Sequence, residues 1–312
     1  MKPNKKMLLA LGVAAALGMS GAANAGVLAS STFSITNFLL SDNATGTTLA
    51  ASDFNSLVAT NNGGVLASLT GFTDVSRSFN LPLTDPNTDL ARACVGGGCG
   101  SAPPENNFSV LTPPPGSQFS NADQLLAGSA ITLGGPTAGA NAQLRSDVSL
   151  IGTATGKSNA DVGLNSTFLF SLTKNINIGV DFNGAVDLIA FADAGTAFPG
   201  NAQASSSLSV ILTRFDNGAT VFDFNNAGGT RTGCTLNRTL NRNAPFNGTS
   251  SYSCSDVFSA TTGDLTAGTI YQLSIRQNAN TNAQFVPEPG VISLIGLGLL
   301  GMGAALRKRK SA

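Results

Sequence analysis

The fold class is decided by residues 140–150, which read ANAQLRSDVSL. Small and apolar residues fall on most even positions of this stretch, and polar residues fall on the odd positions. Successive side chains of a β-strand point to opposite faces, so a period of two is typical of a strand. Residues 140–150 are therefore predicted to form a strand with one buried face and one solvent-exposed face.

The same alternation returns further along the chain. Apolar residues alternate with polar ones in residues 162–172, 176–182 and 208–212, and again in the last predicted strand, 271–275. The tripeptide DNG at 216–218 is a strong signal for a tight turn. Repeated amphipathic strands joined by polar turns predict an all-β fold of the β-sandwich or jelly-roll type.

The N-terminal half gives different signals. Residues 27–79 are predicted to form the short strands of an antiparallel meander, with a turn at 61–64, NNGG. Residues 80–116 hold seven prolines and are predicted to form a long surface loop or a boundary between two sub-regions. Residues 121–127 are the one part of the core for which a helix is expected.

The N-terminus has the features of a secretory signal peptide. Basic residues precede an apolar stretch at 7–19, and Ala23 and Ala25 form an A-x-A cleavage site. Cleavage after Ala25 would leave Gly26 as the first mature residue. Residues 1–25 are therefore assigned to a signal peptide that engages the secretion translocon and signal peptidase.

The C-terminus predicts a short transmembrane helix. Residues 291–306 are apolar and uncharged, and as a helix they would be about 24 Å long. This length is slightly less than the hydrocarbon core of a bilayer, a gap that local thinning can close. Four basic residues then form a stop-transfer signal on the cytoplasmic side: Arg307, Lys308, Arg309 and Lys310.

Pro287, Glu288 and Pro289 stand immediately before this helix. The order of Pro-Glu-Pro, a short Gly-rich apolar helix and a terminal basic cluster resembles the PEP-CTERM sorting signal of bacterial exosortase substrates. The resemblance covers residues 286–310. It implies that a membrane protease-transpeptidase of the exosortase type removes the tail near these three residues. A permanent single-pass anchor that is never cut is the alternative, because helix physics does not distinguish the two.

The resemblance also implies a destination. Proteins with this tail are exported by Gram-negative bacteria that make exopolysaccharide, and are associated with biofilm or floc matrix. The expected path is a transient inner-membrane anchor followed by the cell envelope, the outer surface or secretion. Exopolysaccharide is a candidate partner on this reading.

The exported part lies between the two signals. Residues 26–277 are assigned to the β-sandwich domain, and residues 278–286 to a polar linker that holds the sorting signal, 287–310, away from it. The chain between the signal peptide and the terminal basic cluster contains ten basic residues and 17 carboxylates, a net charge of −7. This acidic balance argues against nucleic acid as a partner.

Four cysteines are present: Cys94, Cys99, Cys234 and Cys254. An even number in an exported chain favours disulfides. Three pairings are possible, and proximity in the sequence favours Cys94 with Cys99 and Cys234 with Cys254. A zinc site made of all four is the alternative, but the short C-x-x-C spacing that such sites use is missing.

The absence of histidine excludes several classes of enzyme. Ser-His-Asp and Cys-His sites and His-ligated metal centres all need this residue. Paired carboxylates of a glycosidase or lyase leave no fixed spacing, so they stay open. Asp181, Asp187 and Asp193 are the candidates, with exposed strand acids as the simpler explanation.

Two binding sites can be considered. Residues 85–89, DPNTD, carry oxygen-bearing side chains as calcium loops do. However, Leu90 and Gly96 stand where an EF-hand needs glycine and a bidentate acid, and a plain turn explains the composition. No metal and no cofactor are expected. A sugar site lacks its usual platform, because there is no Trp and only Tyr252 and Tyr271, while the 18 Phe are assigned to the core.

Two functions from different classes follow. The first is a non-enzymatic surface or matrix protein, a disulfide-pinned β-sandwich sorted by its C-terminus. The second is a secreted polysaccharide-modifying enzyme that uses carboxylates.

Overall fold

The computed structural model describes most of the chain between the two terminal signals. It covers residues 26–285 apart from 83–87, 114–115, 134–137, 152–156, 194–199, 226–232 and 244–247, with the backbone alone for 157–161, and also Gly298. The described residues form β-strands and one short 3₁₀ turn, η1 (Ala51–Asp53). The strands are β1 (Gly26–Asp42), β2 (Thr47–Thr48), β3 (Phe54–Leu69), β4 (Val75–Pro82), β5 (Thr88–Val95), β6 (Phe119–Ala127), β7 (Ala140–Ile151), β8 (Lys157–Leu172), β9 (Ile178–Ala192), β10 (Gly200–Arg214), β11 (Thr220–Asp223), β12 (Arg238–Asn243), β13 (Gly248–Thr261) and β14 (Ile270–Phe285).

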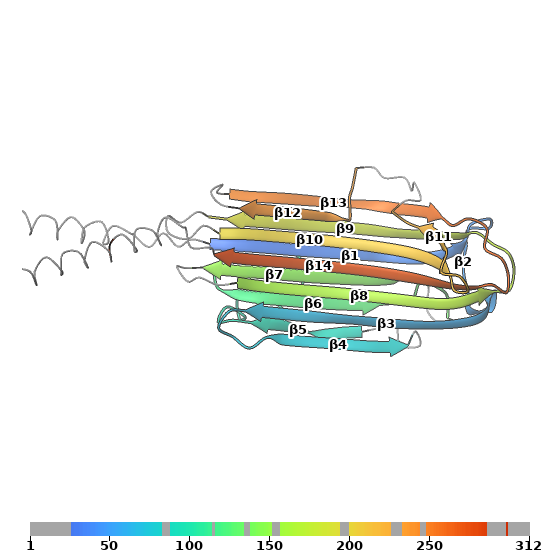
Figure 1. The fold of residues 1–312 in the computed structure, drawn as a ribbon, viewed down its shortest axis with the longest axis horizontal. Coiled ribbons are helices and arrows are strands. Elements are labelled where there is room, and N and C mark those ends of the chain that lie inside the picture. The colour runs from blue at the N-terminus through green and yellow to red at the C-terminus, as the bar shows by residue number, and fades with distance from the viewer. Residues whose placement is uncertain are drawn as a thin grey trace, which may run out of the picture.

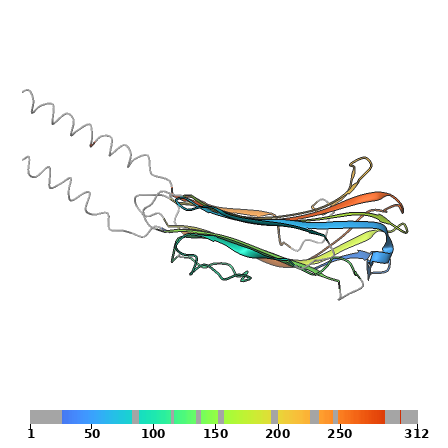
Figure 2. The same ribbon diagram turned by 90° about the horizontal axis from the view of Figure 1, so that it is seen from below.

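The strands form two sheets that pack face to face, which confirms the expected all-β class (Figures 1 and 2). The β1 sheet has the order β13-β9-β1-β7-β6-β5, with β2 added to β1. The β14 sheet has the order β11-β10-β14-β8-β3-β4, with β12 added to β10. All the strand pairs are antiparallel. The first and last strands of the domain thus lie inside different sheets, each with a neighbour on both sides.

Apolar side chains from both inner faces fill the space between the sheets. At one end of it four phenylalanines, Phe38, Phe182, Phe224 and Phe258, pack with ring centroids 5.2–6.1 Å apart. Burial of large aromatic side chains is the main favourable contribution to such a core. The assignment of every Phe to the core is wrong, because Phe72 and Phe215 are 51% and 57% exposed.

The alternation in the sequence predicted the long strands of the C-terminal half correctly. Residues 140–150, 162–172, 208–212 and 271–275 all lie within strands, and 178–182 lie in β9. The tight turn at 216–218 is also confirmed. Gly218 has φ +68° and its N–H donates to the carbonyl of Arg214 over 2.9 Å.

The predicted solvent-exposed face of residues 140–150 is wrong. Arg145, Asp147 and Ser149 point away from the other sheet but are completely buried. The segment between β5 and β6 lies over them; we call it the strap (residues 96–113 and 116–118). Arg145 Nη1 donates to the carbonyl of Asn107, and the hydroxyl of Ser149 donates to the carbonyl of Ser117.

The strap makes further contacts with this outer face. The N–H of Leu111 donates to Ser30 Oγ over 3.2 Å, and the N–H of Asn106 donates to Asp123 Oδ2 over 2.6 Å. The proline-rich stretch predicted to be a surface loop is therefore in part a cover for the β1 sheet. Residues 88–95 of the same stretch form β5 rather than a loop.

The helix expected at 121–127 is a strand, β6, between β5 and β7. Seven of its nine residues are buried, including Asn121, Asp123 and Gln124. Both faces of this strand are covered, so polar and apolar side chains are buried together and no clear alternation is left in the sequence.

The turn predicted at 61–64 is continuous strand within β3, and of the predicted N-terminal meander the structure has the β3–β4 hairpin and the short β1–β2 pair. β1 pairs instead with β7 and β9. A Cβ on Gly63 would lie 2.7 Å from Gln124 Nε2 and 2.8 Å from the Phe79 ring. Gly63 therefore permits close packing of the sheets rather than a reversal of the chain.

The linker predicted at 278–286 is also wrong, because β14 continues to Phe285. Ala279, Thr281 and Ala283 are completely buried against the other sheet, and the residues between them face outward. The domain therefore ends at Phe285 instead of residue 277, and no polar spacer separates the domain from the sorting signal at this point.

The domain begins and ends on the same side. β1 starts, and β14 finishes, at one end of the long axis (Figure 1). Phe285 pairs with Gly200, where an added Cβ would lie 2.2 Å from Val27 Cγ2. The two sheets therefore pack closely where the chain enters and leaves the domain.

The two terminal signals lie outside the described residues. The signal peptide (1–25) and the predicted transmembrane helix (291–306) are not covered, apart from Gly298. No helix among the residues that are covered has the length and apolar character needed to cross a membrane.

Candidate functional site

The three candidate catalytic acids lie along a single strand and do not converge. Asp181 and Asp187 belong to β9 and Asp193 follows its end. At about 3.3 Å per residue, six positions along a strand separate neighbouring members by about 20 Å. Carboxylate pairs that cleave glycosides lie within about 10 Å of each other. Asp187 instead accepts a hydrogen bond from the hydroxyl of Ser253 on β13.

The candidate calcium loop is only partly described. Residues 83–87 lie outside the description, and Asp89 is on β5. Asn106 of the strap donates from Nδ2 to Asp89 Oδ2 over 2.7 Å and from its N–H to Asp123 over 2.6 Å. Within the covered part of the chain, no group of three acids, cysteines or histidines is arranged to hold a metal.

The four cysteines form two disulfides in the favoured pairing, Cys94 with Cys99 and Cys234 with Cys254. The first closes a turn at the start of the strap, where Gly96 has φ +114° and an added Cβ would lie 2.7 Å from the carbonyl of Gln118. The second fixes the segment after residue 232 against β13. Both bonds therefore hold irregular chain onto the edges of the sandwich.

A buried polar cluster under the strap was missed by the sequence analysis. Asp147 accepts hydrogen bonds from Ser30 Oγ (2.6 Å), Asn121 Nδ2 (3.2 Å) and the guanidinium of Arg145. Burial raises the pKa of the neighbouring Asp123 carboxyl above its usual value, with smaller contributions from nearby Glu105 and Asp89. The strap excludes a polymeric substrate from this cluster, which fits a structural role.

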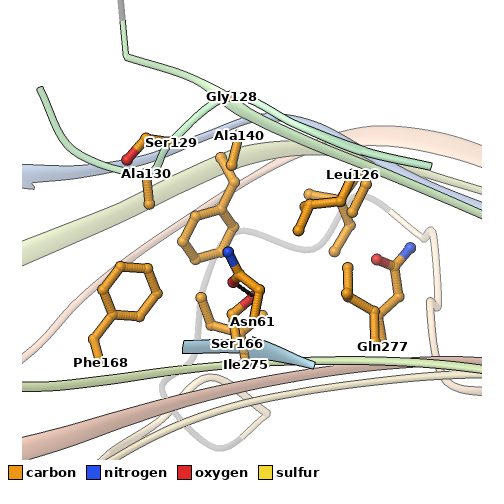
Figure 3. A pocket seen from close by; sticks show the side chains of 14 residues that line it. Asn61, Leu126, Gly128, Ser129, Ala130, Ala140, Ser166, Phe168, Ile275 and Gln277 are labelled. Atoms are coloured by element: carbon orange, nitrogen blue, oxygen red, sulfur yellow. Dashed lines mark hydrogen bonds between the residues drawn. The ribbon is translucent and has the colours of Figure 1, made fainter. Parts of the chain in front are cut away.

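A small cavity lies between the sheets (Figure 3). Its volume is about 40 Å³, and most of its lining is apolar, with Asn61, Ser129, Ser166 and Gln277 as polar members. Ser166 Oγ donates to Asn61 Oδ1 over 2.7 Å, and Gln277 Nε2 donates to the carbonyl of Phe33 over 3.1 Å. This volume suits about two or three water molecules and is too small for a sugar ring.

The outer face of the β14 sheet is different, because it is open and carries many uncharged polar groups. Side chains that alternate with the buried residues point outward from β14, β10, β8, β3 and β4. We call this surface the amide face; its described members include Asn62, Ser78, Asn80, Asn165, Gln203, Ser207, Asn278, Asn280 and Asn282. Carboxamides and hydroxyls both donate and accept hydrogen bonds, as sugar hydroxyls do.

Two glycines form a hollow in the middle of the amide face. Gly64 and Gly163 pair across β3 and β8, and together with Asn62, Asn165 and Asn278 they line an open hollow of about 400 Å³. A Cβ on Gly163 would lie 2.9 Å from Asn278 Oδ1. The missing side chains thus create the depression.

A second hollow follows along the same face toward the end where β14 finishes. It has a volume of about 620 Å³ and is lined by residues 68–72, Asp74, Asn280 and Asn282. Phe72 is 51% exposed in the turn after β3 and supplies an aromatic side chain beside the amides. Both hollows are wide open, and together they follow β14 over about 20 Å.

One part of this surface is visible in the sequence, although its composition also fits a linker. Residues 278–285, NANTNAQF, alternate outward amides with small inward residues, as an amphipathic strand does. Their polar composition led to the prediction of a linker. Phe72 could not be distinguished by sequence from the phenylalanines of the core.

The chain was compared with known proteins. Residues 285–310 match the family model described as the PEP-CTERM protein-sorting motif. No curated protein matches the chain. The matched segment begins at Phe285, the last residue of β14, so the signal starts directly at the end of the domain. The chain carries a PEP-CTERM protein-sorting motif at its C-terminus and is an exported protein that is sorted by an exosortase.

Proposed function

We propose that this protein is a non-enzymatic component of the cell surface or extracellular matrix that binds exopolysaccharide through the amide face. The observation that carries the proposal is the combination of two neighbouring hollows, rows of carboxamides and the exposed ring of Phe72. Amides match sugar hydroxyls, and an exposed ring can pack against the apolar face of a sugar. A long, open surface suits a polymer better than a single sugar.

The binding claim is tested with the processed protein and exopolysaccharide purified from the producing bacterium. In co-sedimentation, Phe72→Ala is expected to weaken binding about tenfold, as loss of one buried aromatic contact does. Phe215→Ala is the matched control, because Phe215 is equally exposed but lies at the turn after β10, away from both hollows. Equal binding by both variants, or no binding by the unaltered protein, contradicts the proposal.

The competing function is a carboxylate-dependent enzyme that modifies polysaccharide. Chain shortening or new reducing ends after prolonged incubation with the exopolysaccharide would favour it over the matrix role. The separation of Asp181, Asp187 and Asp193 along one strand supports binding without turnover.

We further propose that export ends with removal of the tail near Pro287-Glu288-Pro289 and release of the domain to the envelope or surface of a Gram-negative cell. Mass spectrometry of the mature protein should find a C-terminal peptide that ends within or before this block. Recovery of intact Arg307–Lys310 from envelope fractions would instead establish a permanent anchor.

A further inference from the structure

β13 is the longest uninterrupted edge of the sandwich. It has 14 residues and pairs with β9 on one side without a register shift (Figure 1). The other edges are shorter or irregular: β4 has 8 residues and ends in Pro82, β5 has 8 with a bulge between Leu90 and Ala93, and β11 and β12 have 4 and 6.

The hydrogen bonds of Val257 show which backbone groups face the open side of β13. Its N–H donates over 2.8 Å to the Oδ1 of its neighbour Asp256, and not to Asn183, the residue opposite on β9. Backbone groups alternate in direction along an antiparallel strand, so residues 249, 251, 253 and 255 also point their N–H and C=O groups outward. Within the described chain, these groups have no backbone partner.

Natural edge strands are normally protected by lysine, proline, bulges or a covering segment. β13 contains no lysine and no proline, and its only charged residue is Asp256. The residues whose backbone groups point outward, Thr249, Ser251, Ser253 and Ser255, have small, exposed side chains. The segment held by the Cys234–Cys254 disulfide contacts β13 through the side chains of Cys254 and Tyr252, and no bond of the described chain joins it to the outward backbone groups. The edge is therefore able to accept another strand.

We propose that β13 pairs antiparallel with β13 of a second copy of this chain, around a twofold axis at Cys254. A strand edge is complementary to itself in the antiparallel orientation, and a twofold contact uses the same surface of both copies. This register aligns residue 253 with 255 and residue 251 with 257, so residues with outward N–H groups meet each other. It joins the two β1 sheets into one continuous sheet.

Charge also favours a second copy as the occupant. In this register Asp256 lies opposite Tyr252 of the other copy. The guanidinium carbon of Arg238 lies 5.1 Å from the centre of the Tyr252 ring, and Arg238 forms no ion pair within the part of the chain that is described. Each copy therefore brings a carboxylate toward an unpaired guanidinium, twice in the dimer.

Sedimentation velocity of the processed protein over a range of concentrations tests the pairing. The unaltered protein should reach the mass of a dimer. Ser251→Pro removes one outward N–H without removing a bond to β9, and should raise the dissociation constant at least tenfold. Ser251→Ala keeps the N–H and should leave dimerisation unchanged. Purely monomeric protein, or equal dimerisation of the Pro and Ala variants, overturns the proposal.

A charge exchange provides a second test that does not depend on the folding of the proline variant. Asp256→Arg should weaken the dimer, and Arg238→Asp in the same chain should restore it. Failure of the exchange to restore dimerisation, in variants that keep their β-sheet circular dichroism, contradicts the register. Binding to exopolysaccharide is measured in parallel. Because the β13 edge and the amide face lie on different sheets, loss of dimerisation and loss of exopolysaccharide binding can be observed separately.

Discussion

The Nε of Arg145 donates to Oδ2 of Asp147, two positions further along β7, and both side chains are completely buried beneath the strap. Removing one member of a buried ion pair leaves an uncompensated charge. We expect Asp147→Ala to lower the free energy of unfolding by about 3–5 kcal/mol, measured by urea denaturation.

The surface pair Arg214–Asp216 is the control for this prediction, since both side chains are partly exposed and 2.8 Å apart. Asp216→Ala should change the free energy of unfolding by less than about 1 kcal/mol. Similar losses in the two variants would show that the strap does not exclude water from Arg145.

Lys174 and Asp42 should make stability depend on pH at the acid end. Lys174 Nζ lies 2.8 Å from Asp42 Oδ2, and this hydrogen bond lowers the pKa of Asp42 and raises the pKa of Lys174. A carboxyl group whose pKa is lowered by folding stabilises the protein at pH values above its unfolded-state pKa. This contribution is lost as the pH falls through the folded-state pKa. The free energy of unfolding of Lys174→Gln should therefore fall less than that of the unaltered protein as the pH is lowered from 5.

Asp123 should have the opposite effect. Burial raises the pKa of Asp123. Its contribution to stability is therefore present at pH values below its unfolded-state pKa and is lost as the pH rises through the folded-state pKa. Asp123→Asn removes this titration and keeps an oxygen that can accept from Asn106. Relative to the unaltered protein, the variant should gain stability as the pH rises from 3 to 7. A constant difference across that range would contradict the raised pKa.

Gly200 should tolerate no side chain. An added Cβ would lie 2.2 Å from Val27 Cγ2, and overpacking of this kind costs about 1–3 kcal/mol. Gly200→Ala should lower the melting temperature, whereas Gly97→Ala, where no atom lies within 4 Å of the added Cβ, should change it little.

A strand is visible in the sequence when polar and apolar residues keep to separate faces, whether or not both faces are buried. β7, β8 and β10 have regular alternation at their inner positions and were predicted, as was the first part of β14. β6 lacks this separation, because buried polar residues occupy both of its faces: Asn121 and Asp123 lie under the strap, and Gln124 lies on the inner face with Leu126. The covering of Arg145 could not be predicted, because a proline-rich segment carries no signal for the surface on which it lies.

The candidate site shows the same limit. Alternation can place Asn278, Asn280 and Asn282 on one face, but the hollows arise where Gly64 meets Gly163 and where Phe72 meets residues of β14. Such meetings depend on the register between distant strands. The sorting signal was recognisable because all of its parts are contiguous in the sequence.

The placement of Gly26 and Phe285 at one end has a consequence for the timing of assembly. With the proposed membrane anchor in place, all copies are held by the same end, so neighbouring molecules that stand upright point their β13 strands in the same direction. The proposed contact needs opposite directions. On these proposals, attachment disfavours dimerisation, and removal of the tail frees the molecules to turn over and pair.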